Sequence, residues 1–281
     1  MSYKTILVHF NDERRLVNLL SPALDLARRF EAHLIGLAVL PPPIVEPSFT
    51  PGGAGPTIIE SHRKAFAQEA ARMKTAFETA SRDAGLITEW VSEDAKPWPV
   101  WRKVVEYARA ADLIVSAQPD PDWPLSGMME APDQLVLQTG RPVLLIPNRG
   151  SHVGAGRRVL IAWNGRREAA RAAFDALPLL KKAAEVKVLW VNPQDEEDEA
   201  KDLPAADLCT GLARHKVTCE ATEVIQPKTG VGETLMARVH ESGADLLVMG
   251  CYGHSRFTEL ILGGVSRYVL QNMTVPVLMA H

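Results

Sequence analysis

The sequence predicts an α/β fold made of two tandem doubly wound domains, each a five-stranded parallel sheet with helices on both faces. The length of 281 residues suits two domains, because single cores stop growing beyond about 250–300 residues. The chain also repeats the order of its apolar runs, which indicates a duplicated fold. Within each copy, β-branched runs alternate with amphipathic helical stretches, as is typical of parallel sheets covered on both sides.

The repeat is visible at the start and at the end of each copy. A strand-like pattern begins at Lys4 (KTILVHF) and returns 153 residues later at Arg157 (RRVLIAW). The run ADLIVSA at Ala111 returns 133 residues later as ADLLVMG at Ala244, so the first copy holds about 20 extra residues between these points. Many of them lie in the segment 41–57, whose Pro and Gly content predicts a long surface loop.

The other elements follow from the same patterns. Strands are predicted at ILVHF and LIVSA in the first copy and at VKVLWV and DLLVMG in the second, and the last strand of each copy follows a proline. Amphipathic patterns predict helices over 57–84 and 169–182. The polar, glycine-rich segment 148–156 separates the copies, so we expect domains at residues 1–149 and 157–281.

Composition excludes several classes of protein. A formal net charge of −3 gives no overall attraction to nucleic acid or to an anionic membrane. No apolar stretch is long enough to span a bilayer, and the N-terminus lacks the pattern of a secretory signal. Cysteine occurs at Cys209, Cys219 and Cys251, an odd number without a CxxC, which argues against a disulfide scaffold or a thiolate metal site. We expect a cytoplasmic protein with a small-molecule or protein partner.

The loop after the fourth strand of the second copy is the candidate binding element. Ligands of open parallel sheets bind beyond the carboxyl ends of the strands, and here the chain reads G-x2-G-x9-G-G-V-S from Gly250 to Ser266. Gly250 and Gly253 let the backbone turn sharply and approach a ligand without a Cβ. Gly263 and Gly264 precede a predicted helix, whose first amides and dipole suit a phosphate, with Ser266 as a hydroxyl donor.

This loop, between a strand ending in VMG and a strand reading VPVLM, resembles the nucleotide-binding loop of the universal stress protein family. The resemblance covers nearly all of the chain as two consecutive domains. The first three glycines match the family pattern G-x2-G-x9-G, whereas Gly264 stands where Ser or Thr is usual, so one phosphate-facing hydroxyl is lost. The resemblance implies ATP or a related adenine nucleotide as the ligand, with any Mg²⁺ held mainly through the phosphates.

The resemblance also assigns residues. Val191 and Met249 fall at the positions of the family's adenine contacts, and Asn164 replaces the usual acidic residue after the first strand. Asn can hydrogen-bond the nucleotide but offers no charge to a metal, so we expect weakened binding. The implied contacts are Asn164, Val191, Met249, Gly250, Gly253, Gly263, Gly264, Val265 and Ser266.

The first copy lacks this loop. Ala117 and Pro119 stand there, no second glycine has the correct spacing, and proline removes an amide donor. We therefore predict no nucleotide in the first copy, where Asn11 after the first strand decides nothing by itself. The resemblance further implies that the copies pack as an internal pseudo-dimer through their last strands, and it allows the whole chain to form a homodimer.

Several of these residues have a plainer interpretation. Ser266 can cap a helix without a ligand, and Cys251 fits a small apolar residue better than a reactive thiol. His254 and Arg256 either face phosphate or are solvated, and the acidic run 195–199 suits a helix start better than a metal. Tryptophans that either pack in a core or line a pocket are Trp90, Trp98 and Trp101.

The sequence thus leads to three functional hypotheses. The first is a stress-response sensor or regulator that binds an adenine nucleotide in its second copy. The second is a nucleotide-independent interaction scaffold, which Gly264 keeps open. The third is slow ATP hydrolysis, for which no residue is an evident general base because Asn164 replaces the carboxylate. An enzyme is therefore not predicted beyond weak ATP hydrolysis.

Overall fold

The computed structural model describes residues 2–42, 55–192, 205–225, 229–251 and 264–281. Outside these ranges lie two of the candidate site glycines, the two cations of the same loop and the acidic run: Gly253, Gly263, His254, Arg256 and 195–199.

The two halves of the chain contain the same succession of strands. The first half runs through β1 (Thr5–His9), η1 (Glu13–Arg15), α1 (Leu16–Phe30), β2 (His33–Leu40), α2 (Gly55–Asp83), β3 (Thr88–Asp94), α3 (Val100–Ala108), β4 (Leu113–Ala117), α4 (Ser126–Met129), α5 (Pro132–Thr139) and β5 (Val143–Ile146). The second half runs through β6 (Arg158–Trp163), α6 (Arg167–Asp175), α7 (Leu177–Leu180), β7 (Glu185–Asn192), α8 (Ala205–Arg214), β8 (Glu220–Ile225), α9 (Val231–Ser242), β9 (Leu246–Gly250), α10 (Gly264–Asn272) and β10 (Val277–Ala280).

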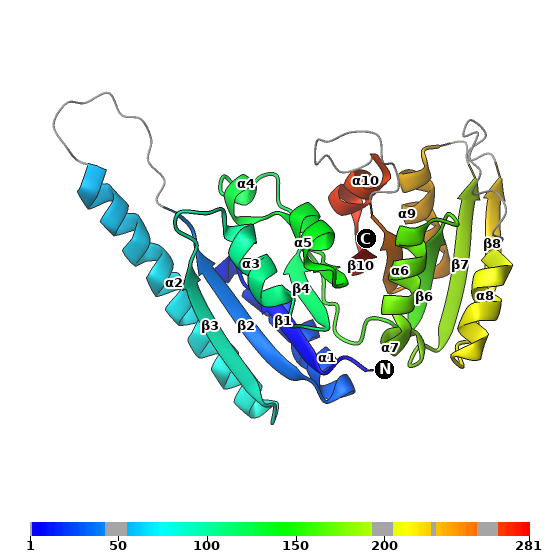
Figure 1. The fold of residues 1–281 in the computed structure, drawn as a ribbon, viewed down its shortest axis with the longest axis horizontal. Helices are drawn as coiled ribbons and strands as arrows, with labels where there is room; N and C mark the ends of the chain where they lie inside the picture. Colours follow the sequence, from blue (N-terminus) through cyan, green and yellow to red (C-terminus); the bar gives the residue numbers. More distant parts are fainter. Residues whose placement is uncertain (1, 43–54, 193–204, 226–228, 252–263) are drawn as a thin grey trace.

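The ten strands of the described ranges form one sheet, in the order β3-β2-β1-β4-β5-β10-β9-β6-β7-β8. Pairing is parallel within each half, and the halves join where β5 and β10 pair antiparallel. Figure 1 shows β10 between the two halves of the chain. This confirms the expected five parallel strands in each half and the packing of the halves through their last strands. The domain boundaries 1–149 and 157–281 stay a prediction.

Strand register repeats between the halves as the sequence offsets require. Ile6 pairs with Leu113 in the first half, and Val159 pairs with Leu246 in the second. An aspartate at the start of the fourth strand, Asp112 or Asp245, accepts hydrogen bonds from backbone amides at the start of the first strand. The two halves therefore share a side-chain interaction as well as the order of their strands.

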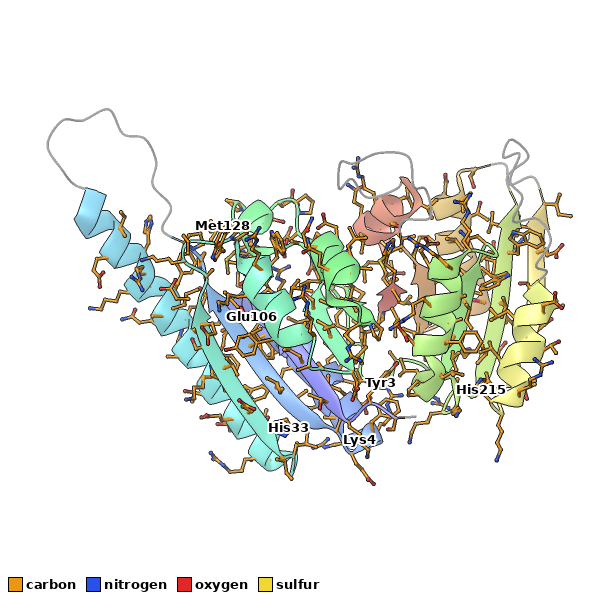
Figure 2. The ribbon with its side chains drawn as sticks, viewed as in Figure 1. Tyr3, Lys4, His33, Glu106, Met128 and His215 are labelled. Carbon is orange, nitrogen blue, oxygen red and sulfur yellow. The ribbon has the colours of Figure 1, made fainter. Side chains whose placement is uncertain are left out.

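Helices cover both faces of the sheet, as predicted, and two apolar layers result. One layer packs the sheet against α1, α2, α6, α7 and α8, and the other packs it against α3, α4, α5, α9 and α10 (Figures 1 and 2). The central strands β4 and β9 are buried on both faces, whereas the edge strands β3 and β8 are rich in polar residues. In the described ranges, no helix is long and apolar enough to cross a membrane.

Two helix boundaries differ from the sequence predictions, and the tryptophans of the first half divide between two surroundings. The helix predicted over 169–182 is two short helices, α6 and α7, because Pro178 starts a new turn. The loop predicted to end at residue 57 ends earlier, since α2 already begins at Gly55. Trp90 packs between Phe10 and Phe77 in the core, apart from Trp98 and Trp101, whose rings contact the Arg102 guanidinium.

Candidate functional site

The predicted site residues gather at the carboxyl ends of three adjacent strands. β6 lies between β9 and β7, so Asn164 after β6, Met249 and Gly250 in β9, and Val191 in β7 share one edge of the sheet. Gly264 to Ser266 form the first turn of α10, which follows the loop from β9. The structure thus brings together all of the described site residues at one edge.

Val191 and Met249 lie in the core and not at the surface. Their side chains are 7% and 3% exposed and belong to the apolar layer under α9 and α10. Any contact that these two residues make with a ligand would come from their backbone, as an adenine edge requires hydrogen-bonding groups.

Asn164 is exposed and is held by a local turn. Its Oδ1 accepts a hydrogen bond from the Arg166 amide at 3.2 Å, and Gly165 between them has a φ of +74°. This is an Asx turn, which leads from β6 into α6.

Gly250 has a structural reason to lack a side chain. A Cβ at this position would lie 2.5 Å from the backbone nitrogen of Ala169 and 2.5 Å from the backbone carbon of Glu168. The first turn of α6 therefore packs directly on Gly250. The sequence interpretation, which reserved the bare backbone for a ligand, missed this packing because it depends on a helix about 80 residues away in the chain.

Gly250→Ala is expected to reduce the free energy of unfolding by about 1–3 kcal/mol, because the backbone of α6 must move to make room for the methyl group. Urea unfolding of ligand-free protein measures the loss. The matched control is Gly230→Ala at the start of α9, where a Cβ meets nothing within 4 Å. Equal effects of the two substitutions would contradict the packing explanation.

Ser266 is buried and directed inwards. It is the third residue of α10, so it does not cap this helix, and it is 4% exposed. Burial raises the pKa of Cys251 to about 12, so this cysteine is a protonated core residue at neutral pH. Gly264 is exposed, and a Cβ there would meet nothing within 4 Å; Val265 beside it is half-buried.

Arg167 adds a cation that the sequence interpretation did not single out. Its side chain is 77% exposed, and its guanidinium contacts both Glu168 and the C-terminal His281. His281 Nδ1 lies 2.9 Å from the Cys251 carbonyl oxygen, and its Nε2 lies 3.4 Å from the Arg167 guanidinium. These contacts place the Arg167 side chain beside the end of β9.

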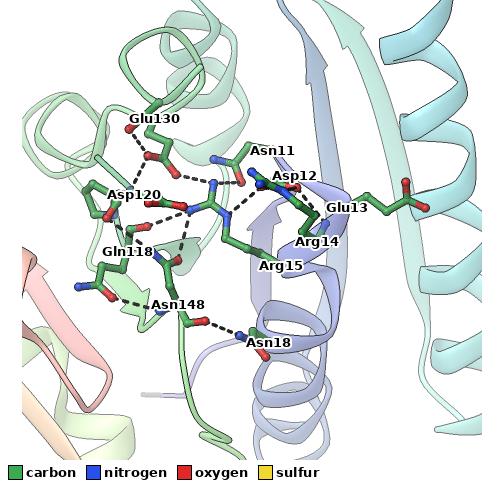
Figure 3. Close-up of polar contacts among 12 residues, drawn as sticks. Asn11, Asp12, Glu13, Arg14, Arg15, Asn18, Gln118, Asp120, Glu130 and Asn148 are labelled. Atoms are coloured by element: carbon green, nitrogen blue, oxygen red, sulfur yellow. Dashed lines mark hydrogen bonds and ion pairs between the residues drawn. The ribbon is translucent and has the colours of Figure 1, made fainter. Parts of the chain in front are cut away.

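The equivalent edge of the first half is filled by its own side chains (Figure 3). Arg15 is 6% exposed and forms an ion pair with the buried Glu130. Its guanidinium also donates to the Gln118 carbonyl at 3.1 Å and to Oδ1 of Asn148 at 3.2 Å and Asn11 at 3.3 Å. By the repeat offset, Arg15 stands where the second half has Glu168, so the buried charge is reversed.

Glu130 places a carboxylate in the loop of the first half. Its Oε2 accepts from the Asp120 amide at 2.9 Å and from the Ser126 hydroxyl, while its other oxygen faces Arg15. At the constant offset of this region, Asp120 and Glu130 align with Gly253 and Gly263 of the second half. The first half therefore supplies an internal anion at a loop whose counterpart in the second half has glycines.

Comparison with known proteins supports this relationship. Residues 156–281 match the model of the universal stress protein family. The universal stress protein Slr1230 of Synechocystis sp. is 26% identical over 149 residues, which is 52% of this chain and 49% of that protein. The match thus spans about half the length of this curated relative.

Solved structures extend the likeness in fold to both halves. A universal stress protein from Archaeoglobus fulgidus aligns over 98% of this chain and 97% of its own, with a TM-score of 0.69 and 16% identity. A functionally unknown protein from Pseudomonas aeruginosa PAO1 aligns over 99% of this chain and 92% of its own, with a TM-score of 0.60 and 15% identity. The second half, residues 156–281, belongs to the universal stress protein family, and the whole chain has this family's fold in two tandem copies.

Proposed function

We propose that the second half binds an adenine nucleotide, ATP or a close relative, at the carboxyl edge of β9, β6 and β7, and that the chain acts as a stress-response sensor or regulator in the cytoplasm. The main support is the convergence of three strand ends with the first turn of α10, where Gly264 leaves the backbone open. Amides and the dipole at a helix start favour an anion.

In this proposal, different residues of the site contact different parts of the nucleotide. The first turn of α10 and the exposed Arg167 face the phosphates, Asn164 offers its amide to the ribose or the base, and the backbone of Val191 and Met249 borders the adenine. Any Mg²⁺ would be held by the phosphates, since Asn164 provides no charge. No residue in these roles is a general base, so turnover is not part of the proposal.

The first half binds no nucleotide in this proposal. The Glu130 carboxylate already accepts the hydrogen bond of the Asp120 amide and pairs with the charge of Arg15. A phosphate would have to displace this carboxylate, whose side chain is 4% exposed. A phosphate and the Glu130 carboxylate are both negative, and two like charges held close together in a buried setting repel each other strongly. We therefore expect at most one nucleotide per chain.

Mass spectrometry of the small molecules released on denaturing protein purified without added ligand tests the proposal. The wild type is expected to release up to one adenine nucleotide per chain, and Gly253→Val is expected to release none because the added side chain blocks close approach to the backbone. The control is Gly127→Val in α4 of the first half, where a Cβ meets nothing within 4 Å. Undiminished nucleotide in Gly253→Val would refute the site.

One observation favours the scaffold as a second candidate function. Gly264 stands where a hydroxyl residue is usual, and the hydroxyl residue two positions later, Ser266, is buried at 4% exposure. A universal stress protein fold without a nucleotide would then serve as an interaction surface. The same release experiment separates the candidates, because a scaffold releases no nucleotide even from the wild type.

A further inference from the structure

One side chain of the first half contacts the last helix of the second half. Gln118 directly follows β4, and its Nε2 donates a hydrogen bond to the Leu270 carbonyl at 2.8 Å. Leu270 lies in the last turn of α10, which ends at Asn272, and the last four carbonyls of a helix have no partner within it. Gln118 therefore supplies, from the other half, a donor that α10 itself lacks.

The orientation of the Gln118 side chain is fixed by two backbone groups. The Asn148 amide donates to Oε1 at 3.1 Å, and the Leu270 carbonyl accepts from Nε2. A backbone amide only donates and a carbonyl only accepts, so the side chain cannot be turned over without losing both hydrogen bonds. The Gln118 carbonyl in turn accepts from Arg15, which pairs with the buried Glu130 (Figure 3). The donor to α10 is therefore joined to the ion pair of the first half.

The second half offers no equivalent contact in return. At the offset of 133 residues, Gln118 and Leu270 align with Cys251 and Leu137. Cys251 is 1% exposed and has no side-chain amide, so it cannot make the same pair of hydrogen bonds. The support thus runs in one direction, from the half that we expect to bind no nucleotide to the half that we expect to bind one.

α10 contains the first turn, Gly264 to Ser266, that we propose to face the phosphates. The helix has nine residues, so its two ends are only about 14 Å apart. A shift at its carboxyl end therefore also moves its first turn. Binding groups must stay within about 0.5 Å of their productive positions, so a restraint at Leu270 also acts on a ligand at the first turn.

We propose that Gln118 is a positioning residue for α10, through which the first half supports a nucleotide site that it does not itself form. The effect on nucleotide affinity rests on the proposed function, whereas the restraint on α10 does not. Gln118 touches none of the proposed nucleotide contacts, so it acts on the ligand only through the position of the helix.

Gln118→Glu is the sharpest variant for testing the restraint. It keeps the shape of the side chain and the acceptor for the Asn148 amide, but at neutral pH it has no donor for Leu270 and adds a negative charge at the negative end of α10. Hydrogen exchange of ligand-free protein, followed by mass spectrometry, is expected to show the α10 amides exchanging about tenfold faster than in the wild type. Exchange in α3 is expected to stay unchanged.

Two further variants separate this restraint from a general loosening of the protein. Gln118→Lys keeps a donor that suits the end of a helix but loses the acceptor, and it is expected to restore slow exchange in α10. Tyr3→Phe is the matched control, because the Tyr3 hydroxyl donates to the Asp175 carbonyl of the other half at 2.7 Å without touching α10. It is expected to leave the exchange of α10 at the wild-type rate.

Calorimetric titration of the same variants with ATP and Mg²⁺ provides the second readout. Gln118→Glu is expected to bind ATP about fivefold more weakly than the wild type, and Tyr3→Phe is expected to bind it equally well.

Unchanged α10 exchange in Gln118→Glu, or equally fast exchange in Gln118→Lys or Tyr3→Phe, would overturn the restraint by Gln118. Faster exchange together with unchanged ATP affinity would overturn its role in binding. If the wild type binds no ATP and α10 still responds to Gln118→Glu, the restraint stands and the proposed nucleotide function fails.

Discussion

Arg15→Met is expected to lower the free energy of unfolding by about 3–5 kcal/mol, the usual cost of leaving a buried charge without its partner. The side chains of Arg15 and Glu130 are 7% and 4% exposed, and they form an ion pair. Methionine fills a similar volume but leaves the Glu130 carboxylate and three uncharged acceptors without the guanidinium. Urea unfolding at neutral pH measures the change.

Arg238 in α9 is the matched control for this substitution. Its side chain is 49% exposed and pairs at 2.9 Å with Glu241, which is 60% exposed. Arg238→Met is expected to cost less than about 1 kcal/mol, as exposed pairs usually do. Arg15→Met combined with Glu130→Gln is expected to cost clearly less than the sum of the two single changes, because the pair acts as a unit. Additive costs would contradict the network.

Arg14 and Arg15 also affect the pKa of the neighbouring Asp12 carboxyl. Burial by itself would raise the pKa of Asp12, but hydrogen bonds from Arg14 and the charges of Arg14 and Arg15 lower it overall. Asp12 is therefore an anion at neutral pH, close to the place where a phosphate would have to enter the first half. This negative charge is part of the reason why we expect no nucleotide there.

Much of the fold could be predicted from the sequence because the repeat and the apolar periodicity are local patterns. The equivalence of Ile6 with Val159 and of Ala111 with Ala244 was enough to predict five strands in each half and their parallel pairing. Helix boundaries were less certain, as α6 and α7 show, since a single proline can divide an amphipathic pattern without changing its period.

The site was less predictable because the residues that contact each other there lie far apart in the sequence. The role of Gly250 depends on Glu168 and Ala169, and the closure of the first half depends on Arg15 and Glu130, which are 115 positions apart. An alignment of the two halves does carry a signal, since acidic residues in the first half replace glycines of the second. Whether those acids face solvent or an arginine requires the structure.

His9 is expected to make the protein lose about 3 kcal/mol of stability as the pH falls from about 6.5 to about 4. It ends β1, is 3% exposed, and its Nε2 has no hydrogen-bond partner among the described residues. Burial, and then the charge of Arg15, lower its pKa to about 4, whereas the unfolded chain binds a proton near pH 6.5. The unfolded state therefore binds more protons in this range, so stability is complete above pH 6.5 and declines below it.

Urea unfolding between pH 4 and pH 7 measures this loss, and His9→Met isolates it. In the variant, the unfolding free energy is expected to depend less on pH, because the contribution of His9 is absent. The wild type therefore loses more stability than the variant as the pH falls. His240→Gln, at an exposed position of α9, is the control and should keep the pH dependence of the unfolding free energy.

The second half has Ala162 at the position equivalent to His9, so the acid sensitivity that His9 causes belongs to the first half. Parallel pH profiles for the wild type and His9→Met would mean that His9 is protonated in the folded protein, next to Arg15, and that the charged network at this edge is arranged differently.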